Sequence, residues 1–131
     1  MSKIRMLLVE DDADDVQLLQ EALVENNIAC EMDVVMEGDK VVPFLNGLET
    51  PPDIIVMDFN LPKIHGKDVL VAIRSLPAFK SVPVVVLTTS ASPHDLQFAM
   101  KYGANRFITK PSTIQGFNAA VKEIASAAGI Q

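Results

Sequence analysis

The feature that most constrains the fold of this chain is a repeated alternation of short apolar runs with segments of helical period. Runs rich in aliphatic and β-branched residues occupy 4–9, 31–36, 53–58, 82–88 and 106–109. The first, third and fourth are almost continuously apolar, which is typical of strands covered on both faces by helices. Strand and helix alternating five times predicts an α/β domain with a parallel sheet and right-handed crossovers.

Apolar residues at helical spacing lie between these runs. Helices are expected over 13–26 and 66–76, and a last helix carries an apolar stripe from Phe117 to Ala128. Ser92 before Pro93 is typical of an N-cap followed by a first-turn proline. Gly66, and either Ser112 or Thr113, stand where the third and fifth helices would begin. After the second strand, Pro43 must fall in the first turn of a helix or break it.

Length and composition narrow the class of protein. A chain of 131 residues is expected to form one domain, residues 1–131. The net charge of −6 and the scattered basic residues argue against nucleic acid as a partner. No apolar run approaches the ~18 residues that span a bilayer. The single cysteine, Cys30, suits a reducing cytoplasm and is expected to be a small, partly buried apolar residue, with a regulatory thiol as the alternative.

Five strands of this kind are expected in the doubly wound order 2-1-3-4-5, with functional groups beyond their carboxyl ends. The residues found there are Glu10, Asp11, Asp58, Thr88, Thr89, Ser90 and Lys110. If the strand order holds, three carboxylates, hydroxyl groups and a lysine converge on one pocket. No single member of this set would carry the argument, because each alone is an ordinary strand-end residue.

The chemistry of such a pocket follows from its charges. Two carboxylates about 4 Å apart repel by roughly 4 kcal/mol at an effective dielectric near 20, so they favour a proton or a cation between them. All-oxygen ligands favour Mg²⁺ or Mn²⁺ over zinc, and neither His65 nor His94 has a partner at zinc-ligand spacing. A carboxylate beside a divalent cation and Lys110 is placed to attack phosphorus, which predicts phosphoryl transfer to Asp58.

The remaining acids of the N-terminal cluster have a simpler interpretation. Asp12, Asp14 and Asp15 fall at the start of the first predicted helix, where the macrodipole favours negative charge. Asp14 and Asp15 are therefore predicted to be solvated first-turn residues, and Asp12 a cap or an outer residue of the cation site.

The segments "LLVEDD", "IIVMDFNLPKIHG", "VVVLTTSA" and "FITKP", in this order and spacing, resemble the receiver domain of two-component response regulators over essentially the whole chain. The resemblance implies a CheY-like, flavodoxin-like fold. It also implies that Asp58 accepts the phosphoryl group and that Asp11 ligates Mg²⁺ directly. Glu10 would act through bound water, and the Asn60 backbone carbonyl would be a further ligand.

The resemblance implies roles for the other strand-end residues as well. Thr88 would hydrogen-bond the phosphoryl group and Lys110 would pair with it, while Phe107 stands where many relatives have a switch tyrosine. A cis peptide before Pro111 is typical of the family. Asn60 and Ser90, each two residues beyond a key residue, are predicted to flank the approach of hydrolytic water and to set the phosphoryl lifetime.

The function predicted is a signalling module and not an enzyme acting on a separate substrate. Its expected partners are a histidine kinase or histidine phosphotransfer protein, a downstream protein that binds residues 93–129, and a second copy in a homodimer. With no output domain expected, the chain could also be a phosphorelay intermediate. The "LTTS" run and the length resemble stand-alone receivers of bacterial phytochromes.

Two other classes of protein compete with this interpretation. An aspartyl phosphohydrolase generally carries its nucleophile after the first strand and has a cap domain, whereas here the nucleophile follows the third strand. A flavodoxin-like cofactor binder needs a first loop that cradles phosphate, and "EDDADD" would repel it.

Overall fold

The computed structural model describes residues 3–129. Its strands form one five-stranded parallel sheet. Its strands are β1 (Ile4–Val9), β2 (Cys30–Val35), β3 (Ile54–Met57), β4 (Val84–Thr88) and β5 (Arg106–Thr109). Their order is β2-β1-β3-β4-β5, and every neighbouring pair is parallel. The predicted order 2-1-3-4-5 is confirmed, and with it the meeting of the first and third strands at the switch point.

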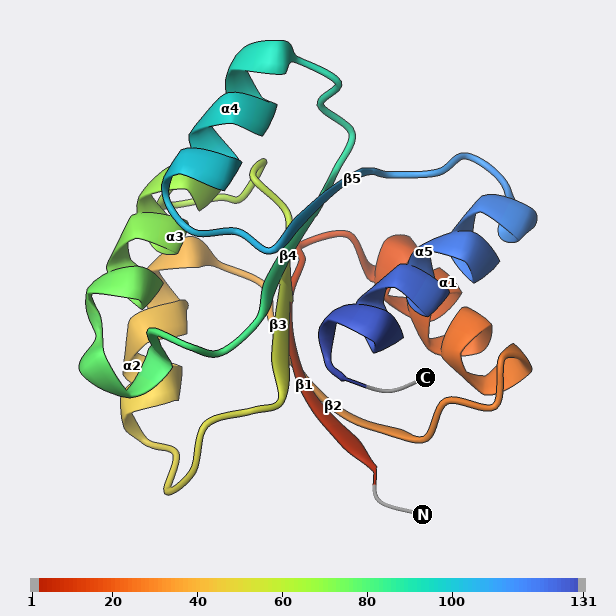
Figure 1. The fold of residues 1–131 in the computed structure, drawn as a ribbon, viewed down its shortest axis with the longest axis horizontal. Helices are drawn as coiled ribbons and strands as arrows, with labels where there is room; N and C mark the ends of the chain where they lie inside the picture. The colour runs from red at the N-terminus through yellow and green to blue at the C-terminus, as the bar shows by residue number, and fades with distance from the viewer. Residues whose placement is uncertain (1–2, 130–131) are drawn as a thin grey trace.

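Helices cover both faces of the sheet. They are α1 (Ala13–Glu25), α2 (Val41–Asn46), α3 (Gly66–Ser75), α4 (Pro93–Lys101) and α5 (Ile114–Ala127), with short 3₁₀ turns at Gly38–Lys40 and Pro77–Phe79. Figure 1 shows the sheet nearly edge-on, with α2, α3 and α4 on one side and α1 and α5 on the other. The fold is therefore three layers, as doubly wound α/β domains require.

The strands are almost continuously apolar because successive side chains point to opposite faces, and both faces are buried. Toward α2, α3 and α4 the sheet contributes Leu7, Val9, Ile55, Met57, Val84 and Val86. Toward α1 and α5 it contributes Ile4, Met6, Leu8, Ile54, Val56, Val85 and Leu87. Two separate apolar cores thus cover the two faces of the sheet. They keep the strands in place, and with them the carboxyl edge where the polar residues lie.

The helix starts agree with the signals in the sequence. The side chains of Asp12, Ser92 and Thr113 accept hydrogen bonds from backbone N–H groups in the first turns of α1, α4 and α5. The choice between Ser112 and Thr113 is thereby decided. Pro43 lies in the first turn of α2, where its missing N–H costs no intrahelical hydrogen bond.

Element boundaries differ from the predicted ones by one or two residues, as is usual where strands fray. The second strand begins at Cys30 and ends at Val35. The fourth begins at Val84, after Pro83, which has no N–H to give to a sheet ladder. The limits of the predicted domain, residues 1–131, stay a prediction, since residues 1–2 and 130–131 lie outside the described range.

Cys30 is half-buried and packs against the core under α1 and α5. Burial, with a smaller effect of Glu31, raises the pKa of the Cys30 thiol to about 11, so the thiol stays protonated at neutral pH. This agrees with the apolar interpretation of the residue. Within residues 3–129, no helix is both long and apolar enough to cross a membrane.

Candidate functional site

The predicted acids meet at the carboxyl edge of β1 and β3. Glu10 and Asp58 are buried, and Asp11 is exposed beside them. One carboxylate oxygen from each of the three lies within 4.8 Å of the others. The Asp58 backbone N–H donates to the Val9 carbonyl, which links the two strand ends directly. Neighbouring strands of a parallel sheet therefore bring together acids that are 47 and 48 residues apart in sequence.

The backbone around Asp58 is fixed by a close approach of α3. The Gly66 N–H donates to the Phe59 carbonyl at 2.8 Å. A Cβ atom at Gly66 would lie 2.4 Å from the Phe59 Cα and 2.5 Å from the Asp58 carbonyl oxygen. A side chain at position 66 would thus push directly on the backbone that carries Asp58, which explains the glycine.

Lys110 is the centre of the ion pairs in the site. Its ammonium donates to Glu10 Oε1 and Asp15 Oδ2, both at 2.8 Å, and to Asp58 Oδ2 at 3.0 Å. The lysine side chain is only 6% exposed. Burial disfavours the charged form, but the three hydrogen bonds outweigh it and raise the pKa of Lys110 above its usual range. The lysine is therefore a permanent cation among three carboxylates.

Glu10 shows the opposite balance. Burial raises the pKa of the Glu10 carboxyl, and the nearby charge of Asp58 adds to this, while Lys110 opposes both. The net effect is a carboxyl that is harder to ionise than an ordinary glutamate. Additional positive charge at this edge would favour its ionised form, and a divalent cation is one source of such charge.

The contact between Asp15 and Lys110 corrects the prediction that Asp15 is only a solvated first-turn residue. Asp15 lies on the face of α1 that turns toward the sheet, one turn before Leu19 and two turns before Ala22, both of which are buried. This position on the buried stripe was the available signal. Asp12 acts as the predicted cap, its Oδ1 accepting from the Asp14 and Asp15 N–H groups.

Thr88 lies fully buried at the end of β4, the neighbour of β3. Its hydroxyl oxygen accepts from the Ser90 N–H at 3.4 Å. The Ser90 hydroxyl donates to Asp95 Oδ2 at 2.6 Å, and Asp95 Oδ1 pairs with Lys67 Nζ at 2.6 Å. A chain of polar contacts therefore runs from Thr88 to α4 and α3, and its members Asp95 and Lys67 were not singled out from the sequence.

Asn60 borders the site from the β3 side. Its backbone N–H donates to Asp58 Oδ1 at 3.0 Å and so orients the carboxylate. Its side chain reaches Thr89 Oγ1 at 3.4 Å. Asn60 thus links the loops after β3 and β4 above Asp58, while Ser90 is engaged by Asp95. The predicted effect of Asn60 and Ser90 on phosphoryl lifetime stays a prediction.

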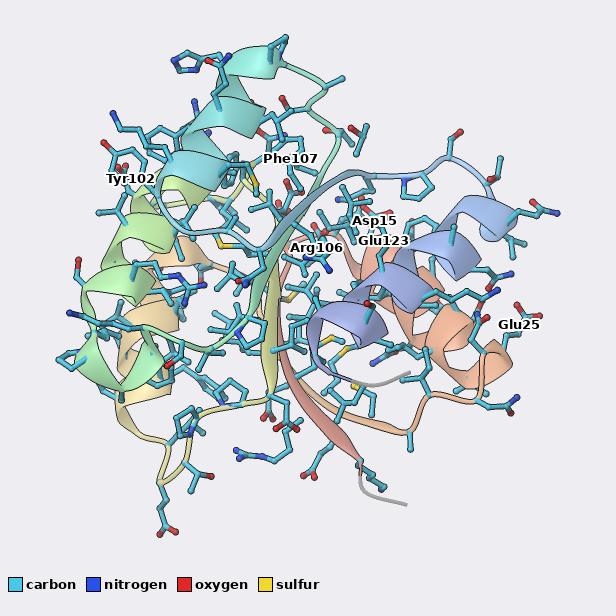
Figure 2. All side chains as sticks on the ribbon, in the orientation of Figure 1. Asp15, Glu25, Tyr102, Arg106, Phe107 and Glu123 are labelled. Atoms are coloured by element: carbon cyan, nitrogen blue, oxygen red, sulfur yellow. The ribbon has the colours of Figure 1, made fainter. Side chains whose placement is uncertain are left out.

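Phe107 is half-buried and faces the core on the α4 side. Its ring meets the Phe59 ring edge-on, with the centroids 6.1 Å apart. In Figure 2, Phe107 is found on the α4 side of β5 and Asp15 on the other side. Phe107 therefore touches the residue that directly follows Asp58, as a switch residue would need to, and that role stays a prediction.

Two smaller predictions have different outcomes. His65 caps α3, with Nδ1 accepting from the Lys67 N–H, and His94 is exposed on α4, so neither belongs to the trio of possible metal ligands, as expected from their spacing. The expected cis peptide before Pro111 is wrong, since residues 3–129 contain no cis peptide bond. The trans form is the ground state of an X–Pro bond, and Lys110 reaches all three carboxylates from it.

The donor set fits a hard divalent cation. Glu10, Asp11 and Asp58 offer only oxygen atoms, which Mg²⁺ and Mn²⁺ prefer, and their net negative charge exceeds what Lys110 neutralises. A neighbouring carbonyl such as that of Asn60 is a ligand of the same hardness. The site can therefore hold a cation next to a carboxylate nucleophile.

Comparison with known proteins points to one family. A family model described as response regulator receiver domain matches residues 6–122. The response regulator Rcp1 of Synechocystis sp. is 35% identical over 126 residues, which cover 92% of this chain and 86% of that protein.

Two solved structures are similar over almost their whole length. The phosphorylated cyanobacterial phytochrome response regulator RcpA matches with a TM-score of 0.86 at 34% identity, covering 95% of this chain and 93% of its own. The Mn²⁺-bound form of response regulator Rcp1 matches with a TM-score of 0.83 at 34% identity, covering 94% and 92%. These likenesses extend over the sheet, the helices and the site described above.

Proposed function

The chain belongs to the response regulator receiver domain family of two-component signalling, and from this we propose that Asp58 accepts a phosphoryl group from a phosphohistidine. The donor is a histidine kinase or a histidine phosphotransfer protein. The observation that carries the proposal is the convergence of Asp58 with Lys110, Glu10 and Asp11 at one sheet edge.

The site residues divide the work of the transfer. An Asp58 carboxylate oxygen attacks phosphorus while the phosphorus–nitrogen bond breaks and leaves its electron pair on the imidazole. Lys110 donates to the phosphoryl oxygens, and Thr88 supplies a hydroxyl group from β4. Glu10, Asp11, Asp58 and the Asn60 carbonyl would hold Mg²⁺ or Mn²⁺, which when bound neutralises charge on those oxygens. The Mn²⁺-bound relative supports this choice of metal.

The output surface proposed is that of α4, β5 and α5. Leu96 and Met100 on α4 and Tyr102 at its C-cap are large apolar side chains that remain exposed. Such side chains favour contact with a downstream protein or with a second copy of the chain. In this proposal the protein is a cytoplasmic phospho-acceptor that catalyses its own modification and does not turn over a separate substrate. Its likeness to phytochrome response regulators favours a phytochrome kinase as the donor.

Labelling with a small phosphodonor tests the assignment. Wild-type protein with acetyl phosphate and Mg²⁺ is expected to gain one phosphoryl group by intact mass, and Asp58→Asn none, because the amide is no nucleophile. Asp68→Asn is the matched control, since Asp68 is an exposed acid of α3. Undiminished labelling of Asp58→Asn would refute the assignment. Repeated consumption of donor without a stable phosphoprotein would instead indicate a phosphohydrolase.

A further inference from the structure

We propose that Asp15 is a positioning residue that holds the Lys110 ammonium in place while the phosphoryl group is transferred to Asp58. This inference rests on the proposed function. It starts from the contact between Asp15 Oδ2 and Lys110 Nζ at 2.8 Å, as short as the contact with Glu10 and shorter than that with Asp58.

The first step concerns the hydrogen-bonding capacity of the lysine. An ammonium group has three donors, and Lys110 directs them at three acceptors, one each on Glu10, Asp15 and Asp58. No donor is left for a phosphoryl oxygen in this arrangement. Lys110 must therefore exchange at least one of its carboxylate partners when it pairs with the incoming group.

The second step concerns which partners are exchanged. Glu10 and Asp58 belong to the trio that can hold a cation, whereas Asp15 does not. Asp58 also loses its negative charge when its oxygen bonds to phosphorus and forms a mixed anhydride. Both partners are thus drawn into the reaction, and Asp15 is the partner that the reaction leaves unchanged. It alone can keep the ammonium oriented from start to finish.

The third step concerns where Asp15 is anchored. It lies in the first turn of α1, and the buried residues Leu19, Ala22 and Leu23 fix that helix to the sheet. The Asp15 side chain is 21% exposed. In Figure 2, Asp15 is found on the side of the sheet that carries α1 and α5. An anchor on a packed helix keeps its position while the loops after β3 and β4 adjust to the phosphoryl group.

The neighbouring Asp14 provides a matched control. It carries the same charge, lies in the same first turn and is exposed. Its backbone N–H donates to the capping residue Asp12, and its carboxylate takes no part in the cap. Substitutions at Asp14 and Asp15 therefore change the net charge and the helix terminus equally. Only those at Asp15 remove a carboxylate that contacts Lys110.

The test is the rate of phosphorylation by acetyl phosphate at saturating Mg²⁺, in wild type and in Asp15→Asn, Asp15→Ala, Asp14→Asn and Asp14→Ala. In this reaction Asp58 attacks phosphorus and acetate leaves with the electron pair. Loss of a charge-assisted hydrogen bond predicts a rate about tenfold lower for Asp15→Ala. Asp15→Asn, which keeps an acceptor oxygen, is expected to lose less, and both Asp14 variants should stay within about twofold of wild type.

A second readout follows Lys110 itself. In ¹⁵N NMR the Lys110 ammonium resonance should be sharp in wild type and Asp14→Ala, and should shift and broaden in Asp15→Ala as the group gains freedom. If wild type is labelled and the Asp15 variants match it in both readouts, the inference is wrong. If wild type is not labelled on Asp58, the proposed function itself fails. Asp15→Asn is nearly isosteric and carries the test should Asp15→Ala not fold.

Discussion

Two helices on opposite faces of the sheet, α5 and α4, are attached to it in different ways. On one side, α5 buries Phe117, Val121 and Ile124 against the sheet and α1. On the other, α4 buries Ala99 and leaves Leu96 and Met100 exposed. The start of α4 is held instead by polar contacts. Phe98 of α4 is only partly buried against the core. The attachment of α5 is therefore mainly apolar, whereas polar contacts make a larger share of the attachment of α4.

This difference matters because the site lies between the two layers. Lys110 is tied to α1 through Asp15, while Thr88 is connected to α4 through Ser90 and Asp95. A phosphoryl group that recruits both Lys110 and Thr88 would therefore pull on one immobile partner and one movable partner. The asymmetry favours transmission of the signal toward α4.

The largest effect on stability is expected from a buried residue of α5. Ile124→Ala shortens a fully buried side chain of α5, and should lower the free energy of unfolding by about 3 kcal/mol. Leu96→Ala on α4, where the residue is 43% exposed, should change it by less than about 0.5 kcal/mol. Urea unfolding followed by circular dichroism measures both. Equal losses would remove the distinction between α5 and α4.

A smaller effect is expected at the far end of α4. Arg74 of α3 donates to the Gly103 carbonyl after α4, and to the Phe79 and Val82 carbonyls before β4. Arg74→Met should lower the free energy of unfolding by about 2 kcal/mol, because charge-assisted hydrogen bonds are lost. Arg106→Met is the control, since among the described residues the Arg106 side chain donates only to the adjacent Asn105 carbonyl. Similar losses in the two variants would contradict the role of Arg74.

The smallest effect on stability is expected from Asp95→Asn, about 1 kcal/mol or less, because the pair with Lys67 is partly solvated. Hydrogen bonds from Lys67 and then Ser90 lower the pKa of Asp95 from its ordinary value of 3.8. A lowered pKa means that the stabilisation is fully present above the ordinary value and is lost as the pH falls through the lowered one.

Unfolding of wild type and Asp95→Asn compared from pH 7 to pH 2 tests this. The difference in free energy between them should be constant down to about pH 4 and should vanish at lower pH. A difference that stays the same down to pH 2 would contradict the role of the Lys67 pair.

The sequence by itself determined the architecture and most of the site. The nearly continuous apolar runs could be satisfied only by strands buried on both faces, and a parallel sheet then requires their carboxyl ends to share one edge. Glu10, Asp11, Asp58, Thr88 and Lys110 follow from that reasoning alone, because each is the last residue of a strand or lies within two residues after one. Residues at strand ends can be predicted because the apolar pattern of each strand shows where it ends, and because few topologies are available to the sheet.

Only the tertiary structure decided the contacts between polar residues that lie far apart in the sequence, because the helical and strand patterns do not specify them. Asp15 and Lys110 are 95 residues apart, and whether the carboxylate meets the ammonium depends on the rotation of α1 against the sheet. The same holds for Lys67 and Asp95, which meet because α3 and α4 lie side by side. The pattern of apolar residues shows which face of a helix is buried. The exact rotation of the helix, however, is set by how the two cores pack. Asp15, Lys67 and Asp95 lie at the border between the buried and the exposed face, so their contacts depend on that rotation.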